Sequence, residues 1–292
     1  MEAVDDVGGH EGKPTQGTQA LAAAAGYNPA QDNNAGMTLV KSAERTLRLF
    51  EIFSSERRPL TVTEIAAALA IPQPSASMLV KSFLAMGYLE ASGEGRRYYP
   101  TLRVMLLGVW MNRAHPAVSR LPQLIEEVSS ATGESVVLAI KNRIYSQYVL
   151  SNVGSSRNPL GVEDGLMYPL ACCSTGWCLL SGLPDEEVAR IVTRTKIEAP
   201  RRYWQSRAHE AKEKVRQFRA CGFVVSDGQT EPGQSAIAIA LGSQSGVSMM
   251  AVAVGGPAER ISRKQDAILA QLDHLSNAYR DMSDRLFDPE AA

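Results

Sequence analysis

Residues 60–89, LTVTEIAAALAIPQPSASMLVKSFLAMGYL, carry the pattern that decides the fold of the N-terminal part of the chain. Thr61 and Glu64 have the spacing of a capping box, in which the threonine accepts a hydrogen bond from the third amide of a helix and the glutamate reaches back. The apolar residues that follow predict a short helix that begins at this box and runs to Ala70.

A second helix is expected immediately afterwards. Pro72 interrupts the first helix, and Pro74 lies where a first helical turn tolerates proline, so we expect this helix from about Gln73 to Met86. Gly87 ends it, because glycine readily adopts the left-handed conformation of a helix C-terminus. Two short helices joined by a tight break predict a helix-turn-helix.

The flanking segments extend this motif. A helical pattern from Ser42, with Leu47, Phe50 and Ile52 or Phe53 on its apolar face, predicts a preceding helix that ends before Pro59. Residues 88–91 and 96–99 look like two strands around a turn, which predicts a hairpin wing. A further helix should lead to the second half of the chain.

The charges are unevenly distributed. Residues 37–113 hold ten Lys or Arg and six Asp or Glu. Residues 1–36 hold one basic and five acidic residues, and the remainder of the chain holds 19 basic and 20 acidic residues. A locally basic module in a chain of net charge −1 is what nucleic-acid contact requires, so double-stranded DNA is the expected partner. Residues 1–36 show no apolar period, and we expect a disordered tail.

The second half alternates helical and strand-like patterns, which predicts an α+β domain. Helices are expected at 118–132, 173–180, 186–193 and 208–221, and strands at 136–140, 144–150, 223–226, 235–241 and 248–254. A last helix is predicted from Ile268, Leu272, Leu275, Tyr279, Met282 and Leu286, which repeat at steps of three and four.

Composition excludes several classes of protein. With 292 residues, 45% apolar and 21% charged, the chain has room for two globular domains, and no apolar run approaches the roughly 18 residues of a membrane span. The acidic N-terminus lacks the features of a secretion signal, so we expect a cytoplasmic protein without a membrane partner. The four cysteines form no CxxC pair and the four histidines are scattered, so no metal and no cofactor are expected.

The ordered segments resemble the IclR family of bacterial transcriptional regulators over roughly residues 40–288. The resemblance rests on residues 60–89 together with SAERTLRLFEIFS (42–54), RRYYPTLRVMLLG (96–108), ATGES (131–135), YPLACCSTGWCLLSGLPDEEV (168–188), RACGFVVSDGQTEPGQSAIAIAL (219–241) and VAVGGPAERI (252–261).

The resemblance implies a domain plan for an α+β protein. After the tail of residues 1–36 come a winged helix-turn-helix DNA-binding domain (37–100), a linker helix (101–115) and a GAF-like effector-binding domain (116–288). Family members assemble as dimers and often tetramers, so we expect a homodimer or homotetramer. The expected function is ligand-responsive regulation of transcription of a catabolic operon, without enzymatic activity.

A recognition helix places its N-terminal half in the major groove. The residues expected at base edges or nearby phosphates are Gln73, Ser75, Ser77 and Met78. Arg45 and Lys81 are expected at phosphates, and Arg96 and Arg97 on the wing at the DNA backbone or the minor groove. Family members commonly carry basic residues where Gln73 and Met78 stand, so this helix departs from the family pattern toward neutrality.

The start of the helix near residue 174 offers free amides and a positive helix end, which suit a carboxylate. The resemblance places Ser174 and Thr175 where effector carboxylates are held, and Ser226 where an acidic ligand contact is often found. The other expected ligand-binding residues are Met167, Tyr168, Cys172, Ala236, Ala253 and Gly255. Alanine and glycine at strand positions that are polar in some members favour an aromatic or alkyl carboxylic acid as the effector.

Two alternatives remain open at this point. The adjacent Cys172 and Cys173 could form a thiol or metal-ion sensor, or one of them could be the nucleophile of an enzyme at the start of a helix, where a thiolate is favoured. No histidine lies in a motif that could supply the base. The simpler interpretation is that these cysteines, with Cys178, are small packing residues.

Overall fold

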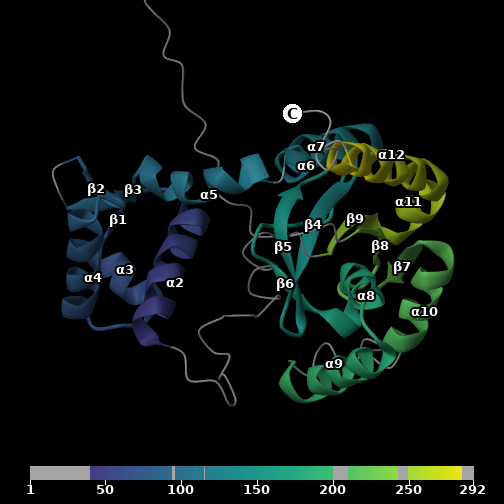
Figure 1. The fold of residues 1–292 in the computed structure, drawn as a ribbon, viewed down its shortest axis with the longest axis horizontal. Helices are drawn as coiled ribbons and strands as arrows, with labels where there is room; N and C mark the ends of the chain where they lie inside the picture. The colour runs from purple at the N-terminus through teal and green to yellow at the C-terminus, as the bar shows by residue number, and fades with distance from the viewer. Residues whose placement is uncertain (1–39, 94–95, 115, 200–209, 243–248, 285–292) are drawn as a thin grey trace, which may run out of the picture. The chain divides into compact units, whose positions relative to one another are not determined.

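The computed structural model describes residues 40–93, 96–114, 116–199, 210–242 and 249–284 (Figure 1). They form two compact units that divide after residue 115. Several sequence predictions lie outside the described residues: the tail of residues 1–36, the turn at 94–95, the helix start at Ala208, the strand start at Ser248 and residues 285–288 with Leu286.

The first unit is the predicted winged helix-turn-helix. Its elements are α2 (Lys41–Glu56), β1 (Leu60–Thr61), α3 (Val62–Leu69), α4 (Gln73–Ala85), β2 (Leu89–Ser92), β3 (Arg97–Pro100) and α5 (Leu102–Ala114). The wing is an antiparallel sheet of order β1-β3-β2. The two-residue strand β1 was not predicted, because a strand of that length leaves no alternation to detect.

The capping box is present as predicted. Thr61 Oγ1 accepts a hydrogen bond from the Glu64 amide at 3.2 Å, and the Thr61 amide donates to Glu64 Oε2 at 2.7 Å. Helix α4 ends at Ala85 with Met86 as its C-cap, and Gly87 has the left-handed φ of +75° that the sequence suggested. On α2, Phe53 is buried and Phe50 packs against the core as expected, whereas Leu47 is 66% exposed and Leu49 is buried in its place.

The second unit is built on one six-stranded antiparallel sheet of order β6-β5-β4-β9-β8-β7. The strands are β4 (Ser135–Asn142), β5 (Tyr145–Asn152), β6 (Met167–Pro169), β7 (Phe223–Asp227), β8 (Gln234–Leu241) and β9 (Met250–Pro257). The helices are α6 (Pro116–Ser119), α7 (Leu121–Thr132), η1 (Leu170–Cys172), α8 (Ser174–Ser181), α9 (Asp185–Glu198), α10 (Ala211–Cys221), α11 (Ala258–Arg263) and α12 (Gln265–Asp284).

The two faces of the sheet carry side chains of different size. Ile237, Ile239 and Leu241 of β8 pack with helices α7 and α12, whose buried residues include Ile268, Leu272, Leu275 and Tyr279. The intervening alanines face helix α8 on the opposite side (Figure 1). Because successive side chains of a strand alternate between faces, the repeat AIAIAL produces both surfaces at once.

Candidate functional site

Helix α4 exposes the face that the sequence assigned to DNA. It buries Ala76, Val80 and Phe83 in the core of the first unit. The opposite face therefore points to solvent, and there Gln73, Met78 and Lys81 are exposed, whereas Ser75 and Ser77 are half-buried. The Gln73 side chain already has a partner within the first unit, because its Nε2 donates a hydrogen bond to Thr63 Oγ1 at 3.3 Å.

The wing arginines differ in their surroundings. Arg97 donates a hydrogen bond from Nη1 to the Pro59 carbonyl at 3.2 Å and lies 3.5 Å from Glu64 Oε2. The hydrogen bond from the Thr61 amide, with support from Arg58, lowers the pKa of Glu64 to about 2, so this carboxylate stays charged beside Arg97. Arg96 is exposed. Arg97 thus has a role in tying the wing to the start of helix α3.

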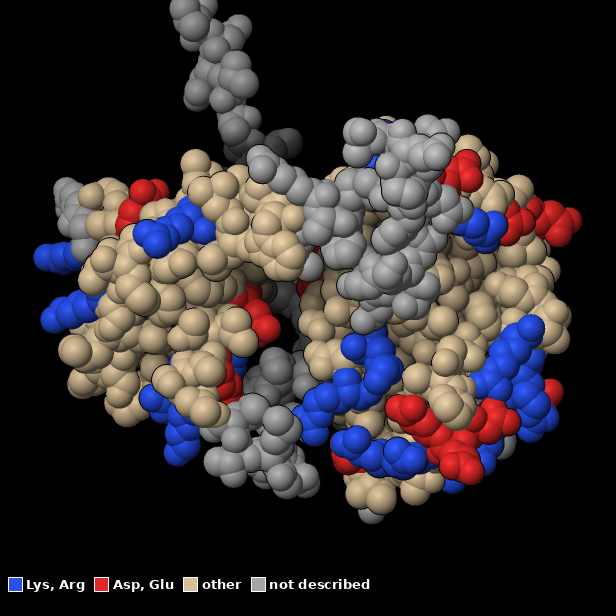
Figure 2. Space-filling view, in the orientation of Figure 1, with Lys and Arg blue, Asp and Glu red and all other residues tan. Residues whose placement is uncertain are grey.

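Basic side chains are visible on the surface of the first unit over α4 and the wing (Figure 2). Lys81 and Arg96 are exposed, and 52% of the Arg97 side chain is exposed. Arg45 lies on α2 and is half-buried. The structure therefore brings the α4 and wing residues to solvent, with Arg45 contributed by a different helix.

The start of helix α8 differs in detail from the expected one. The helix begins at Ser174, and Cys173 is its N-cap, with Sγ accepting a hydrogen bond from the Gly176 amide at 3.3 Å. Thr175 Oγ1 lies 2.8 Å from Ser146 Oγ on strand β5. A Cβ at Gly176 would overlap the backbone of Leu170, so only glycine lets η1 and α8 pack this closely. Two buried hydroxyls therefore meet at the helix start.

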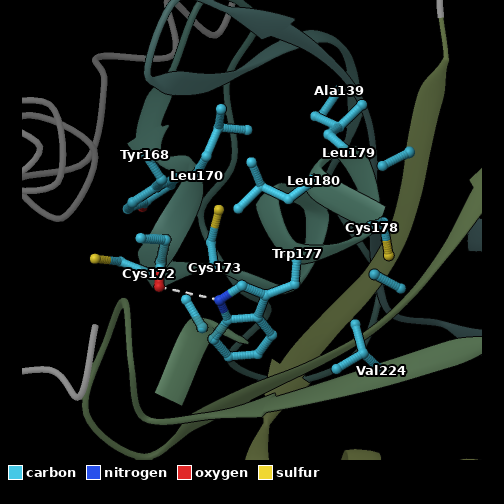
Figure 3. Packing of buried hydrophobic residues seen from close by; sticks show 14 of the residues in the cluster. Ala139, Tyr168, Leu170, Cys172, Cys173, Trp177, Cys178, Leu179, Leu180 and Val224 are labelled. Carbon is cyan, nitrogen blue, oxygen red and sulfur yellow. Dashed lines mark hydrogen bonds between the residues drawn. The ribbon is translucent and has the colours of Figure 1, made fainter. Parts of the chain in front are cut away.

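The cysteines of this segment are buried thiols. Cys172, Cys173 and Cys178 are at most 2% exposed and none forms a disulfide. The side chains of Cys172 and Cys173 point in different directions (Figure 3). Burial raises the pKa of Cys173 and raises that of Cys178 still further. A protonated, inaccessible thiol is a poor nucleophile and a poor redox sensor, which favours the packing interpretation.

The remaining predicted ligand residues lie at two levels of the α8-facing side of the sheet. Ser226, Ala236 and Gly255 are paired in register at the level of Ser135. Tyr168 pairs with Ser146 at the level of Lys141, six residues further along β4. That separation is roughly 20 Å of strand, and Ala253 lies between the two levels, opposite Val137.

Met167 is the exception among these residues. It packs with Ile144 and Tyr145 in a cluster of its own, whereas Tyr168 belongs to the cluster of α8. Neighbouring residues of strand β6 point to opposite faces, so both cannot line one site on the α8-facing side. The grouping of Met167 with Tyr168 does not match the placement of their side chains.

A segment that the sequence did not assign, residues 153–166 between β5 and β6, crosses the Gly255 level; we term it the strap. Leu160 lies so close to Gly255 that a Cβ there would be 2.8 Å from the leucine Cδ2. Ser135 Oγ donates to the Leu160 carbonyl at 2.7 Å and accepts from the Gly154 amide at 3.0 Å. The side chain of Leu160 thus fills the space beside Ala236 and Gly255.

A buried ion network holds the strap. Glu134 has no exposed surface, and its two oxygens accept hydrogen bonds from Arg260 Nε and Nη2 at 2.6 and 2.7 Å. Lys264 Nζ donates to the same carboxylate at 2.8 Å and to the Thr132 carbonyl at 2.7 Å. Arg260 Nη1 reaches the Arg157 carbonyl of the strap at 2.7 Å.

A hollow of about 130 Å³ is lined by Asp185, Val188, Lys212, Val215 and Arg216, and includes none of the predicted effector residues. Among the described residues, no group of three His, Cys, Asp or Glu side chains could hold a metal ion. No helix in the same ranges is long and apolar enough to cross a membrane.

A winged helix-turn-helix followed by an α+β sensor unit defines a class, the ligand-responsive transcriptional regulators. The "IclR helix-turn-helix domain" matches residues 42–93, and "Bacterial transcriptional regulator IclR C-terminal" matches residues 114–283, more than half of the chain. The chain belongs to the IclR family.

Relatives and solved structures agree with this assignment. The Pca regulon regulatory protein of Pseudomonas putida is 25% identical over 250 residues, 84% of this chain and 84% of its own. A putative transcriptional regulator from Rhodococcus sp. RHA1 has a TM-score of 0.65 at 23% identity, covering 85% of this chain and 100% of its own. An IclR homolog complexed with 4-hydroxybenzoate from Microbacterium hydrocarbonoxydans has a TM-score of 0.67 at 19% identity, covering 84% of this chain and 99% of its own.

Proposed function

We propose that this chain controls a catabolic operon in response to a small organic carboxylic acid, and that an aromatic acid fits the site best. The observation that carries the proposal is the pair of buried hydroxyls, Thr175 and Ser146, at the start of helix α8 beside a sheet face that includes Ala139, Ala238, Ala251 and Ala253. Hydroxyls and helix amides suit a carboxylate, and the small side chains leave an apolar surface for its body.

The division of the site into two levels indicates how the acid would lie. Its carboxylate binds at Ser174 and Thr175, next to Tyr168, and its ring extends toward Ala253. Leu160 already fills the Gly255 level, so a short acid uses the nearer level. The names of two similar proteins support this choice, since one regulates the pca regulon and another was crystallised with 4-hydroxybenzoate.

Thr175→Val tests the carboxylate site. The change removes one hydroxyl and nearly preserves shape, so affinity for the effector should fall by about 1–3 kcal/mol while operator binding without effector is unchanged. Ala253→Leu should block the ring from the other side. Calorimetry with benzoate, 4-hydroxybenzoate and aliphatic acids measures both effects.

Thr193→Val is the matched control, because Thr193 is exposed on α9 and its hydroxyl donates only to the Ala189 carbonyl. Thermal melting of each variant separates lost binding from lost packing. An acid that binds the wild type, Thr175→Val and Ala253→Leu equally well would show that the site lies elsewhere in the unit.

Arg96→Ala should weaken binding to operator and random DNA alike and flatten the salt dependence of the affinity by roughly one unit of log–log slope. Arg97→Ala should weaken DNA binding less than Arg96→Ala does, because the Arg97 side chain already contacts Pro59 and Glu64. Fluorescence anisotropy at several salt concentrations gives the slopes, with Arg190→Ala on the exposed surface of α9 as the control. A change of sequence preference with an intact slope would contradict the phosphate role.

We further propose that the active form is a homodimer or homotetramer, joined in part through helix α5. Five large apolar side chains of this helix are 56–75% exposed: Leu102, Met105, Leu106, Leu107 and Trp110. A monomeric protein rarely leaves so much contiguous apolar surface in water. A second copy is the fitting occupant, since paired DNA-binding modules of one kind bind paired half-sites.

A further inference from the structure

One exposed apolar side chain lies in the middle of the DNA-facing surface of α4. Pro74, Met78, Lys81 and Ala85 follow at steps of four, three and four and are all exposed, so they form one stripe opposite the buried face of the helix. Met78 is 63% exposed. It has no hydrogen-bond donor and only a weak acceptor, so it cannot read a base edge as an arginine or glutamine does.

The major groove offers one apolar group to such a side chain. Each base pair presents donors and acceptors there, but only thymine adds a C5-methyl group. The unbranched, polarizable side chain of methionine adapts readily to an apolar contact. Gln73, near the start of the same helix, donates a hydrogen bond from Nε2 to Thr63 Oγ1, whereas the Met78 side chain is exposed to solvent.

We propose that Met78 is a specificity-determining residue that reads the C5-methyl group of a thymine in each operator half-site. The inference rests on the proposed function in one respect, that α4 is the helix that enters the major groove. It goes further by naming the base and the atom group that the helix recognises. Part of the preference of the protein for its operator sequence then comes from an apolar contact with a methyl group rather than from a hydrogen bond.

The experiment uses the full-length protein and an operator selected from random double-stranded DNA. Each thymine of the selected site is replaced in turn by deoxyuridine, which keeps every hydrogen-bonding group and lacks only the methyl. At one position per half-site, the substitution should lower the affinity of the wild type by roughly three- to tenfold. At that position Met78→Ala should bind the thymine and uracil operators equally.

Two variants make the result specific. Met78→Leu keeps an apolar side chain and should retain sensitivity to the methyl group. Met86→Ala should behave as the wild type, because Met86 is also exposed but lies at the C-terminal end of the helix, outside the N-terminal half that reads bases.

The outcomes distinguish this inference from the proposed function. A selected operator whose affinity is indifferent to every uracil substitution would overturn the methyl contact while leaving DNA binding intact. Persistent uracil sensitivity in Met78→Ala would assign the contact to another residue. If selection yields no preferred sequence, the proposed function fails and the inference fails with it.

Discussion

Replacing Glu134 with alanine should lower the free energy of unfolding of the second unit by about 3–5 kcal/mol. The carboxylate is fully buried and accepts hydrogen bonds from Arg260 and Lys264, so its removal leaves two cations facing each other without a counter-charge. It also releases the anchor of the strap at Arg157. Urea unfolding followed by tryptophan fluorescence would report the loss, since Trp177 is in the core of this unit.

Glu198→Ala is the control for this change. Glu198 pairs with Arg194 on the surface of α9, where an ion pair contributes only about 0–1 kcal/mol. A loss of less than 1 kcal/mol in Glu134→Ala would mean that the network is easily replaced by water.

The same carboxylate predicts a pH dependence. Burial opposes ionisation of Glu134, but the hydrogen bonds from Arg260 and Lys264 outweigh it and hold the pKa below its ordinary value of 4.5. A depressed folded-state pKa contributes stability above the unfolded value, and this contribution is lost as the pH falls through the folded value. The stability difference between the wild type and Glu134→Gln should therefore be largest near neutral pH and shrink below about 4.5.

Introducing glutamates at Leu106 and Trp110 should separate the copies of the chain and lower affinity for a two-half-site operator by about 10²–10⁴-fold. Two linked modules make the second DNA contact intramolecular, and that advantage disappears when charges are placed in an apolar contact. Light scattering gives the oligomeric state, and titration with one-half-site and two-half-site DNA gives the affinities.

Leu47→Glu is the matched control, because Leu47 is an equally exposed leucine on a different helix, α2. It should leave both assembly and DNA affinity unchanged. A double variant that still assembles and binds the full site as tightly as the wild type would exclude α5 from the interface.

The local signals in the sequence predicted the first unit well. The capping box at Thr61 and the glycine at 87 act within a few residues, so their effects can be read without knowing the fold. Strand β1 was missed because its two residues become a strand only through pairing with β3. Leu47 was assigned to the buried face, whereas the structure buries Leu49, which lies about 200° further around the helix.

The second unit shows where sequence reasoning ends. The alternation in 235–241 predicted a strand but not which face would meet α8. Glu134 and Arg260 lie in segments that the family resemblance had already drawn on, yet nothing in the sequence links two charges 126 residues apart. The contact between Ser146 and Thr175 depends on sheet register in the same way, and the sequence assigned no element to the strap.

The place that Leu160 occupies bears on how much signal molecule the regulator needs before it responds. At the proposed effector site, an acid long enough to reach Gly255 would have to displace this leucine, so Leu160 would compete with the effector for that space. The apparent dissociation constant is then the intrinsic one divided by the fraction of molecules in which the leucine has moved away. At that proposed site, the response threshold would depend on the residues that contact the effector and also on Glu134, Ser135 and Arg260, which hold the segment that carries Leu160.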